Sequence, residues 1–405
     1  MVTHQTNSEV VTTAGSRVAS VDLLRGLVMI IMALDHVRNY LNFDSLIFSP
    51  TDLERTTPAL FFMRIVTHLC APTFIFLAGT SVFFVAQRKS LKDTSFFLLT
   101  RGAWLIVLQF TLIRFAWNFD PAFRYNSSNV ISTIGFSMIV LAGLIHLPRK
   151  IVFAIGLVMV AGHNLLDGVH FEEGTVDDVV WSFMHVRKLY LLGNDYSFLV
   201  LYPLIPWIGV MALGYCFGHL YGADFTSAQR KRIILQIGVG ALILFFALRW
   251  LNVYGDPLPW SHFDESSKTV MSFFHVEKYP PSLLYLCLML GVSLTVLGLL
   301  EGKTLKRARP VVVFGKVSLF YYILHIYTIH LVAMAAAVLS GYSWRAMIFT
   351  GSNGLASPVL KGQFGFSIAG TYLTWIGVVL LLYPLCDYWN SFKSRHKDRW
   401  WVSYV

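Results

Sequence analysis

The first apolar segment of the chain carries ionisable residues that could do chemistry inside a membrane. The stretch "MALDHVRNYL" (residues 32–41) places Asp35 and His36 directly after nine apolar residues. Ionisable groups inside a spanning helix cost roughly 2.5–3.5 kcal/mol each on insertion scales, so they usually face a partner or a cavity. A histidine can serve as a general base or acyl acceptor near neutral pH. We therefore predict that His36 is catalytic, the alternative being a hydrated helix end.

Two neighbours of His36 on the same helix have separate predicted roles. Adjacent helical residues point about 100° apart, so Asp35 is expected either to orient another histidine or to pair with Arg38, three residues on. Arg25 lies eleven residues before His36, or about 16 Å along a helix, towards the inner face. Arginine binds phosphate through paired hydrogen bonds, so Arg25 is a candidate anion contact. The alternative is an interfacial ion pair with Asp22.

Two later segments contain further candidate histidines. His68 opens the apolar stretch "THLCAPTFIFLAGTS", where a plain interfacial residue is the alternative. His325 follows Ser318 and Tyr321 at helical spacing in "SLFYYILH", and hydrogen bonding between helices is the alternative there. The four cysteines sit singly in apolar segments, and no Cys/His cluster occurs, so the sequence predicts no metal site.

The composition requires that these residues be positioned by membrane-spanning helices. Of the 405 residues, 56% are hydrophobic and only 13% are charged, whereas a soluble domain averages about a quarter charged residues. The predicted fold is all-α, a bundle of about ten transmembrane helices in one domain. The predicted spans are 18–41, 67–87, 96–117, 128–147, 150–166, 197–220, 231–251, 281–300, 311–338 and 365–386.

The distribution of charge predicts the orientation of this bundle. Every second connection is rich in Lys and Arg, while the connections between them are richer in acids, which places both termini in the cytoplasm. The net charge of +10 is therefore explained by the orientation of the helices in the membrane rather than by binding of nucleic acid. Residues 1–17 and 387–405 are predicted to be cytoplasmic tails flanking the domain 18–386. The long outer segments 42–66, 167–196 and 252–280 are expected to cap an outward-facing cavity.

Several stretches resemble known membrane acyltransferases. "SVDLLRGLVMIIMALDHVRNYL", "THLCAPTFIFLAGTS", "RFAWNFDP" and "YPLIPWIGVMALGYCFG" resemble the bacterial branch of the heparan-α-glucosaminide N-acetyltransferase-like family. The Arg25-x10-His36 spacing and "FGKVSLFYYILHIYTIH" are similar to acyltransferase family 3. The resemblance runs from about residue 17 to 386. One departure is that the loop 42–62 lacks the histidine that the lysosomal acetyltransferase carries in its first lumenal loop.

The resemblance implies an enzyme that takes an acyl group, expected to be acetyl, from cytoplasmic acyl-CoA. The acceptor is a sugar or other hydroxyl or amine on the extracytoplasmic side. In acyltransferase family 3 the arginine and histidine of the motif are implicated in activity, and they map onto Arg25 and His36. Our hypothesis assigns His36 as the base, oriented by Asp35 or another polar neighbour, with His68 or His325 second. The predicted acyl-CoA contacts are Arg25, Arg101, Trp207, Ser318 and Tyr321.

The rival hypothesis is a multi-pass transporter in which buried His and Asp residues relay protons. Inverted repeats and paired broken helices, which are typical of transporters, are not evident in the sequence. The expected partners are membrane lipid, acyl-CoA and a glycan or small-molecule acceptor, with no nucleic acid and no metal cofactor. The expected location is the plasma membrane, the inner membrane of a bacterium. The sequence does not decide between a monomer and a homo-oligomer.

Overall fold

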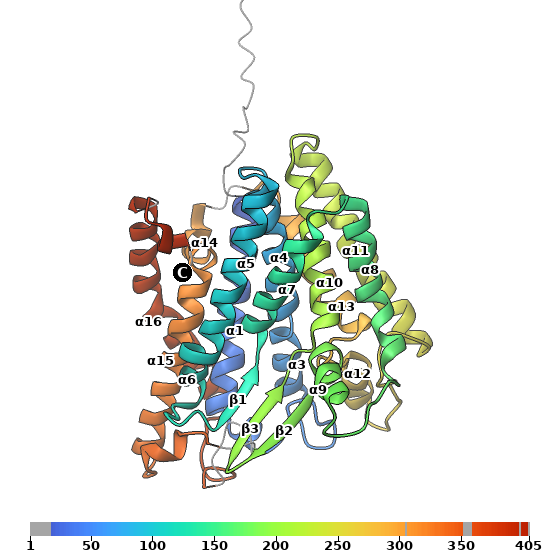
Figure 1. Cartoon of the computed structure of the whole chain (residues 1–405). Coiled ribbons are helices and arrows are strands. Elements are labelled where there is room, and N and C mark those ends of the chain that lie inside the picture. The colour runs from blue at the N-terminus through green and yellow to red at the C-terminus, as the bar shows by residue number, and fades with distance from the viewer. Residues whose placement is uncertain (1–17, 304–305, 351–358, 397, 404–405) are drawn as a thin grey trace, which may run out of the picture.

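The computed structural model describes residues 18–303, 306–350, 359–396 and 398–403, and in them the chain is mainly helical (Figure 1). The predicted N-terminal tail, residues 1–17, lies outside the described residues. The helices are α1 (Ala19–Leu41), α2 (Phe43–Ile47), α3 (Pro58–Thr67), α4 (Cys70–Ala86), α5 (Leu91–Leu108), α6 (Arg114–Asn118), α7 (Val130–Leu144), α8 (Arg149–Gly162), α9 (Val176–Met184), α10 (Leu204–Phe217), α11 (Ser227–Leu251), α12 (Ser266–Phe274), α13 (Leu283–Leu300), α14 (Arg309–Lys316), α15 (Ser318–Leu339) and α16 (Ile368–Arg395). The strands are β1 (Tyr125–Ser128), β2 (Lys188–Gly193) and β3 (Tyr196–Val200).

Eight helical stretches among the described residues are long and apolar enough to cross a membrane. They are Pro58–Ala86, Leu91–Asn118, Arg149–Leu166, Leu204–Tyr221, Ser227–Leu251, Leu283–Leu300, Ser318–Leu339 and Ile368–Arg395. The two other predicted spans correspond to α1, which has 23 residues but carries several charges, and to α7, which has 15 residues. The chain is thus a multi-pass membrane protein, while a total of ten spans and cytoplasmic termini stay predictions.

Several predicted spans have different boundaries in the structure, and the tenth continues in α16 to Arg395 rather than ending at residue 386. The second begins at Pro58 rather than residue 67, because Thr57 caps α3 by accepting from Leu60 N and Pro58 occupies the first turn. Residues 197–200, at the start of the sixth predicted span, belong to β3, and helix α10 begins only after Pro203. The ninth is interrupted at Val317, between α14 and α15. Apolar composition alone locates such segments but does not identify their caps and breaks.

A three-stranded sheet, which the all-α prediction did not include, lies at one end of the bundle. The strand order is β1-β3-β2, with β1 parallel to β3 and β2 antiparallel to it. Figure 1 shows the sheet at the lower end, together with α9 and α12. The segments that were predicted as outer loops therefore contain ordered structure, and β1 and the residues after β3 border the site described below.

Helix α1 is the centre of the packing, because α3, α4, α13, α14, α15 and α16 all contact it. Its closest approach is to α14, where two glycines face each other's backbone. A Cβ atom on Gly26 would overlap the Val311 carbonyl, and one on Gly315 would overlap the Asp22 carbonyl. On another side, the Trp375 indole donates to the Ile30 carbonyl at 2.7 Å. Small residues thus let two helices approach closely, as is common between helices in membranes.

This close approach predicts that Gly26→Ala destabilises the protein. The added methyl group forces α1 and α14 apart, and overpacking of this kind typically costs about 1–3 kcal/mol. Gly143→Ala is the matched control, since a Cβ atom added there would meet no atom within 4 Å, and alanine favours a helix over glycine by about 1 kcal/mol. Thermal melting of the detergent-solubilised variants measures both. Equal melting temperatures for the two variants would contradict this packing.

Candidate active site

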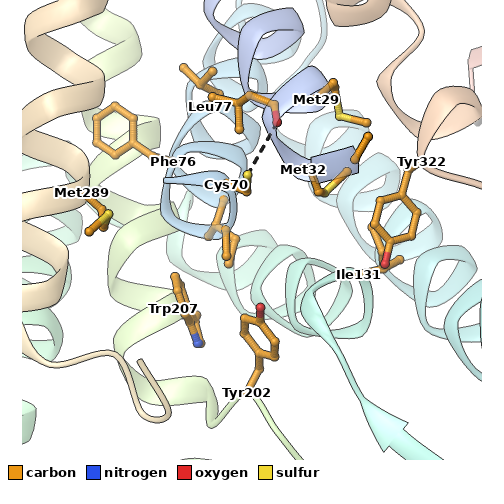
Figure 2. Close-up of a cluster of buried hydrophobic side chains, with 14 of the residues drawn as sticks. Met29, Met32, Cys70, Phe76, Leu77, Ile131, Tyr202, Trp207, Met289 and Tyr322 are labelled. Atoms are coloured by element: carbon orange, nitrogen blue, oxygen red, sulfur yellow. Dashed lines mark hydrogen bonds between the residues drawn. The ribbon is translucent and has the colours of Figure 1, made fainter. Parts of the chain in front are cut away.

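Two cavities of different chemistry meet beside α1. The polar cavity is lined by residues that include Asp35, His36 and Lys278, and the basic cavity by residues that include Arg25 and Arg101. Their linings share residues from three helices, namely Met32 of α1, Val130 of α7 and Tyr322 of α15. Figure 2 shows Met29 and Met32 on one side of this junction and Tyr322 across from them. The two cavities thus follow each other along α1, with Met32, Val130 and Tyr322 between them.

His36 lies at this junction in direct contact with a second histidine. His36 Nδ1 and His325 Nε2 are 2.7 Å apart, and the two rings are nearly parallel, with an interplanar angle of 14°. The edge of Trp117 packs against His36 at 4.7 Å between ring centroids. Both histidines are buried, but only His36 lines the polar cavity. His325 thus contacts His36 but does not itself border the polar cavity.

The hydrogen bonds of this pair determine which nitrogen of His36 can act as a base. The Tyr321 carbonyl lies 2.9 Å from His325 Nδ1, and a carbonyl oxygen only accepts, so Nδ1 carries a proton. With both rings neutral, His325 Nε2 then accepts from His36 Nδ1. The lone pair of His36 is left on Nε2, in a residue that lines the polar cavity. This arrangement suits a general base whose tautomer is fixed by a neighbour.

Asp35 does not contact the histidine pair, because it lies in a cluster with two arginines. Its Oδ1 atom is 2.8 Å from Arg38 Nη2 and 2.7 Å from Arg64 Nη1, and it accepts from the Thr67 hydroxyl at 2.6 Å. The sequence left open whether Asp35 orients a histidine or pairs with Arg38, and in the structure it pairs with Arg38. The cluster joins α1 to α3, and the ring orientation of His36 comes from His325 instead.

The polar cavity has a positive electrostatic character. Among the described residues, its lining contains Arg64 and Lys278 but a single carboxylate, Asp35. Lys278 is 7% exposed, and its ammonium group lies 5.2 Å from the Tyr279 ring centroid. Burial by itself raises the pKa of Tyr279, but the charges of Lys278 and Arg64 outweigh it, so the pKa is lowered below its ordinary value. A cavity of this sign favours anionic groups and developing negative charge.

The basic cavity is the larger of the two, with a volume of about 390 Å³ against about 190 Å³. Arg25, Arg101, Lys316 and Lys393 line it, and its described lining includes no Asp or Glu. Ser318, at the start of α15, also lines it. Arg25 donates to Asp22 Oδ1 at 3.2 Å and to the Ser81 hydroxyl at 2.9 Å. The cavity therefore offers several cations to an elongated anionic ligand.

The other predicted site residues lie outside the linings of both cavities. His68 is buried between α3 and α4, and its carbonyl accepts from the Tyr285 hydroxyl at 2.9 Å. Trp207 is buried against Tyr202, with 5.5 Å between the ring centroids, and both are visible in Figure 2. Tyr321 stacks on His325 with an interplanar angle of 3°. The structure thus brings His36 together with His325, and Arg25 together with Arg101 and Ser318.

Several lining residues were not found by the sequence analysis. Asn39 follows His36 by three residues, so helical spacing could have identified it. Arg64 and Lys278 belong to segments that were interpreted as outer loops. Tyr125 and Ser127 line the polar cavity from β1, and no local pattern in the sequence marks them.

A bundle of membrane-spanning helices that encloses two cavities and a buried histidine pair defines a multi-pass membrane protein with an internal site. The family model described as the catalytic part of heparan-alpha-glucosaminide N-acetyltransferase matches residues 17–254, more than half of the chain. The chain therefore belongs to this family of membrane acetyltransferases, and the predicted resemblance to it is confirmed over residues 17–254, while the similarity to acyltransferase family 3 stays a prediction. The match includes His36, while His325 lies beyond it. A comparison with curated proteins gave no match.

The cluster around Asp35 predicts a large loss of stability in Asp35→Asn. The substitution leaves Arg38, which is 1% exposed, and Arg64 without their counter-ion, and breaking a buried ion pair costs about 3–5 kcal/mol. The control is Arg309→Gln, because Arg309 is exposed and its 3.7 Å pair with Asp387 is expected to contribute about 1 kcal/mol or less. Thermal melting compares them. A wild-type melting temperature for Asp35→Asn would rule out this role for the cluster.

Proposed function

We propose that the protein transfers an acetyl group from acetyl-CoA in the basic cavity to a hydroxyl or amine acceptor in the polar cavity. The observation that carries the proposal is the meeting of the two cavities at Met32, Val130 and Tyr322, beside His36. Family membership supports the acetyl group. The two reactants would enter from opposite ends and react where the cavities join.

His36 would act as the general base in this reaction. Its Nε2 atom takes the proton from the acceptor as the oxygen or nitrogen attacks the thioester carbonyl. The new C–O or C–N bond forms, the C–S bond breaks, and the proton is passed on to the departing CoA thiolate. The same nitrogen could instead carry the acetyl group between two half-reactions. Labelled acetyl-CoA given without acceptor separates these routes, because only the second leaves label on the protein.

The donor assignment rests on the charge of the basic cavity. CoA carries phosphate groups at one end and the thioester at the other, and phosphates bind well to Arg and Lys side chains. Arg101, Lys316 and Lys393 provide such cations in a lining whose described residues include no Asp or Glu. The alternation of basic connections supports a cytoplasmic opening for this cavity. The donor would therefore be the cytoplasmic pool of acetyl-CoA.

The acceptor assignment rests on the lining of the polar cavity. Tyr202, Tyr279 and Trp117 provide aromatic surfaces, and Asn39 and Asn129 provide amide groups. Aromatic faces combined with amide groups suit a sugar, whose ring has an apolar face and hydroxyl edges. The proposed acceptor is a sugar or similar small polar molecule on the extracytoplasmic side of a bacterial inner membrane. The transporter alternative rests on buried ionisable groups alone, and no specific observation favours it.

The proposed base predicts that His36→Ala nearly abolishes transfer. General-base catalysis typically contributes about 10²–10⁴-fold, so kcat should fall by that factor. His325→Phe should lower kcat less and also change the pH dependence of activity, because His325 sets the tautomer of His36. Transfer of labelled acetyl groups by protein reconstituted in vesicles is the measurement. His146→Ala, at an exposed position, is the control.

Full activity of His36→Ala would show that another residue is the base. If His325→Phe lowered activity without changing its pH dependence, His325 would have only a packing role.

The proposed donor site predicts that Arg101→Gln and Lys316→Gln each weaken CoA binding. Hydrogen bonds to charged groups contribute about 1.5–3 kcal/mol, which corresponds to roughly a tenfold or larger rise in Kd. The loss should be smaller at high salt, where screening already weakens the wild-type contact. Calorimetry with CoA measures the Kd of each variant. Lys150→Gln, an exposed position outside the cavity lining, is the control, and equal Kd values for all variants would rule out this cavity.

A further inference from the structure

Three potential metal ligands converge where α8 ends, in a region that the proposed reaction does not use. His163 and Asp167 are four residues apart on the helical turn that follows α8, and His185 follows α9. Their ligand atoms all lie within 4.8 Å of one another. His185 Nε2 is 3.0 Å from Asp167 Oδ1, and the two imidazole rings are 5.5 Å apart between centroids. Two nitrogens and one carboxylate oxygen therefore face a common point.

His163 is the residue that points to a ligand beyond the protein. It is 1% exposed, and neither of its ring nitrogens has a hydrogen bond of ordinary geometry in the described part of the chain. The Pro281 carbonyl lies beside the ring. A buried imidazole without a partner is costly. Binding a cation through one nitrogen while the other faces a backbone carbonyl is the usual arrangement of a metal-ligating histidine.

The remaining groups hold the cluster in place. Asn164 donates to Asp167 Oδ2 at 3.0 Å, and its Oδ1 accepts from Leu283 N at 2.9 Å, which connects the carboxylate to the start of α13. Trp181 packs on the His185 ring at 5.3 Å between centroids. The side chain of Asp167 is 28% exposed, so one side of the cluster is open to solvent. Oriented ligands with an open side characterise sites that also bind water.

We propose that His163, Asp167 and His185 bind a divalent transition-metal ion, with Zn²⁺ as the best match to two imidazoles and one carboxylate. Zn²⁺ binds such ligands at about 2.0–2.2 Å, so ligand atoms that now lie up to 4.8 Å apart would move closer together when the ion binds. The competing interpretation is a hydrogen-bonded cluster of His185 and Asp167 without metal. That interpretation leaves both ring nitrogens of the buried His163 without a hydrogen-bond partner among the described residues, whereas a metal ion would be bound by one of them.

The metal would join the bundle to the segment that borders the polar cavity. His163 and Asp167 lie on the helical turn that follows α8, and His185 lies three residues before β2. β2 pairs with β3, which runs into Leu201 and Tyr202 of the polar-cavity lining. A metal bound here therefore fixes the position of β2 and β3 relative to the helices. This inference does not depend on the proposed transfer reaction.

The test is metal binding by the full chain in detergent, after removal of any affinity tag and treatment with EDTA. Zn²⁺ is added, the protein is desalted, and the metal is measured by mass spectrometry. The expected content is about one Zn²⁺ per chain in the wild type. Loss of a ligand should weaken binding by roughly tenfold or more in His163→Ala, His185→Ala and Asp167→Asn. The control is His170→Ala, an exposed histidine in the same segment that is not part of the cluster.

Two further measurements keep the test decisive. Zn²⁺ should raise the melting temperature of the wild type and of His170→Ala but not that of His185→Ala, because a ligand that binds only the folded state stabilises it. If an alanine variant does not fold, His163→Gln and His185→Gln replace it. Failure of the wild type to retain Zn²⁺, or equal retention by the cluster variants and His170→Ala, would overturn the proposal. The hydrogen-bonded cluster would then be the correct interpretation.

Discussion

Charge inside an apolar bundle must be paired, and the pairing of Asp35 with Arg38 and Arg64 is the constraint on which the site depends. Arg38 lies on the same helix as Asp35, so the rotation of α1 against its neighbours is fixed by the contacts of Asp35 Oδ1 with Arg64 Nη1 at 2.7 Å and with the Thr67 hydroxyl at 2.6 Å, both from α3. That rotation places His36, the next residue along, about 100° away. It therefore faces α15 and the polar cavity rather than α3. The ion cluster orients the helix, and the helix orients the histidine.

Other contacts of α1 fix the same orientation from different sides. Gly26 lies against α14, and the Ile30 carbonyl accepts from Trp375 of α16. The break at Val317 lets α14 pack closely on α1 while α15 runs past it to bring His325 to His36. In a continuous helix over residues 309–339, the two parts would share one axis and could not pack on α1 independently of each other. Irregular backbone at membrane depth is tolerated where protein surrounds it.

Much of this arrangement could be predicted from the sequence, and the part that could not has a physical reason. Apolar runs indicate where helices cross the membrane, and an ionisable pair after nine apolar residues identifies His36 and Asp35 as unusual. The partner of His36 is 289 residues away, and local spacing carries no information about such a contact. Arg64 and Lys278 reach the cavity from segments that appeared to be loops. The sheet that includes β1 forms through pairing with a distant strand, which periodicity does not show.

The central claim is that a thioester in one cavity meets an acceptor from the other beside His36. An experimental structure with a non-hydrolysable thioether analogue of acetyl-CoA tests it directly. The account predicts phosphate density near Arg101 and Lys316 and the acyl carbonyl at the Met32–Tyr322 junction, facing His36 Nε2. Density for the analogue outside the basic cavity, or an acyl group directed away from His36, would contradict it.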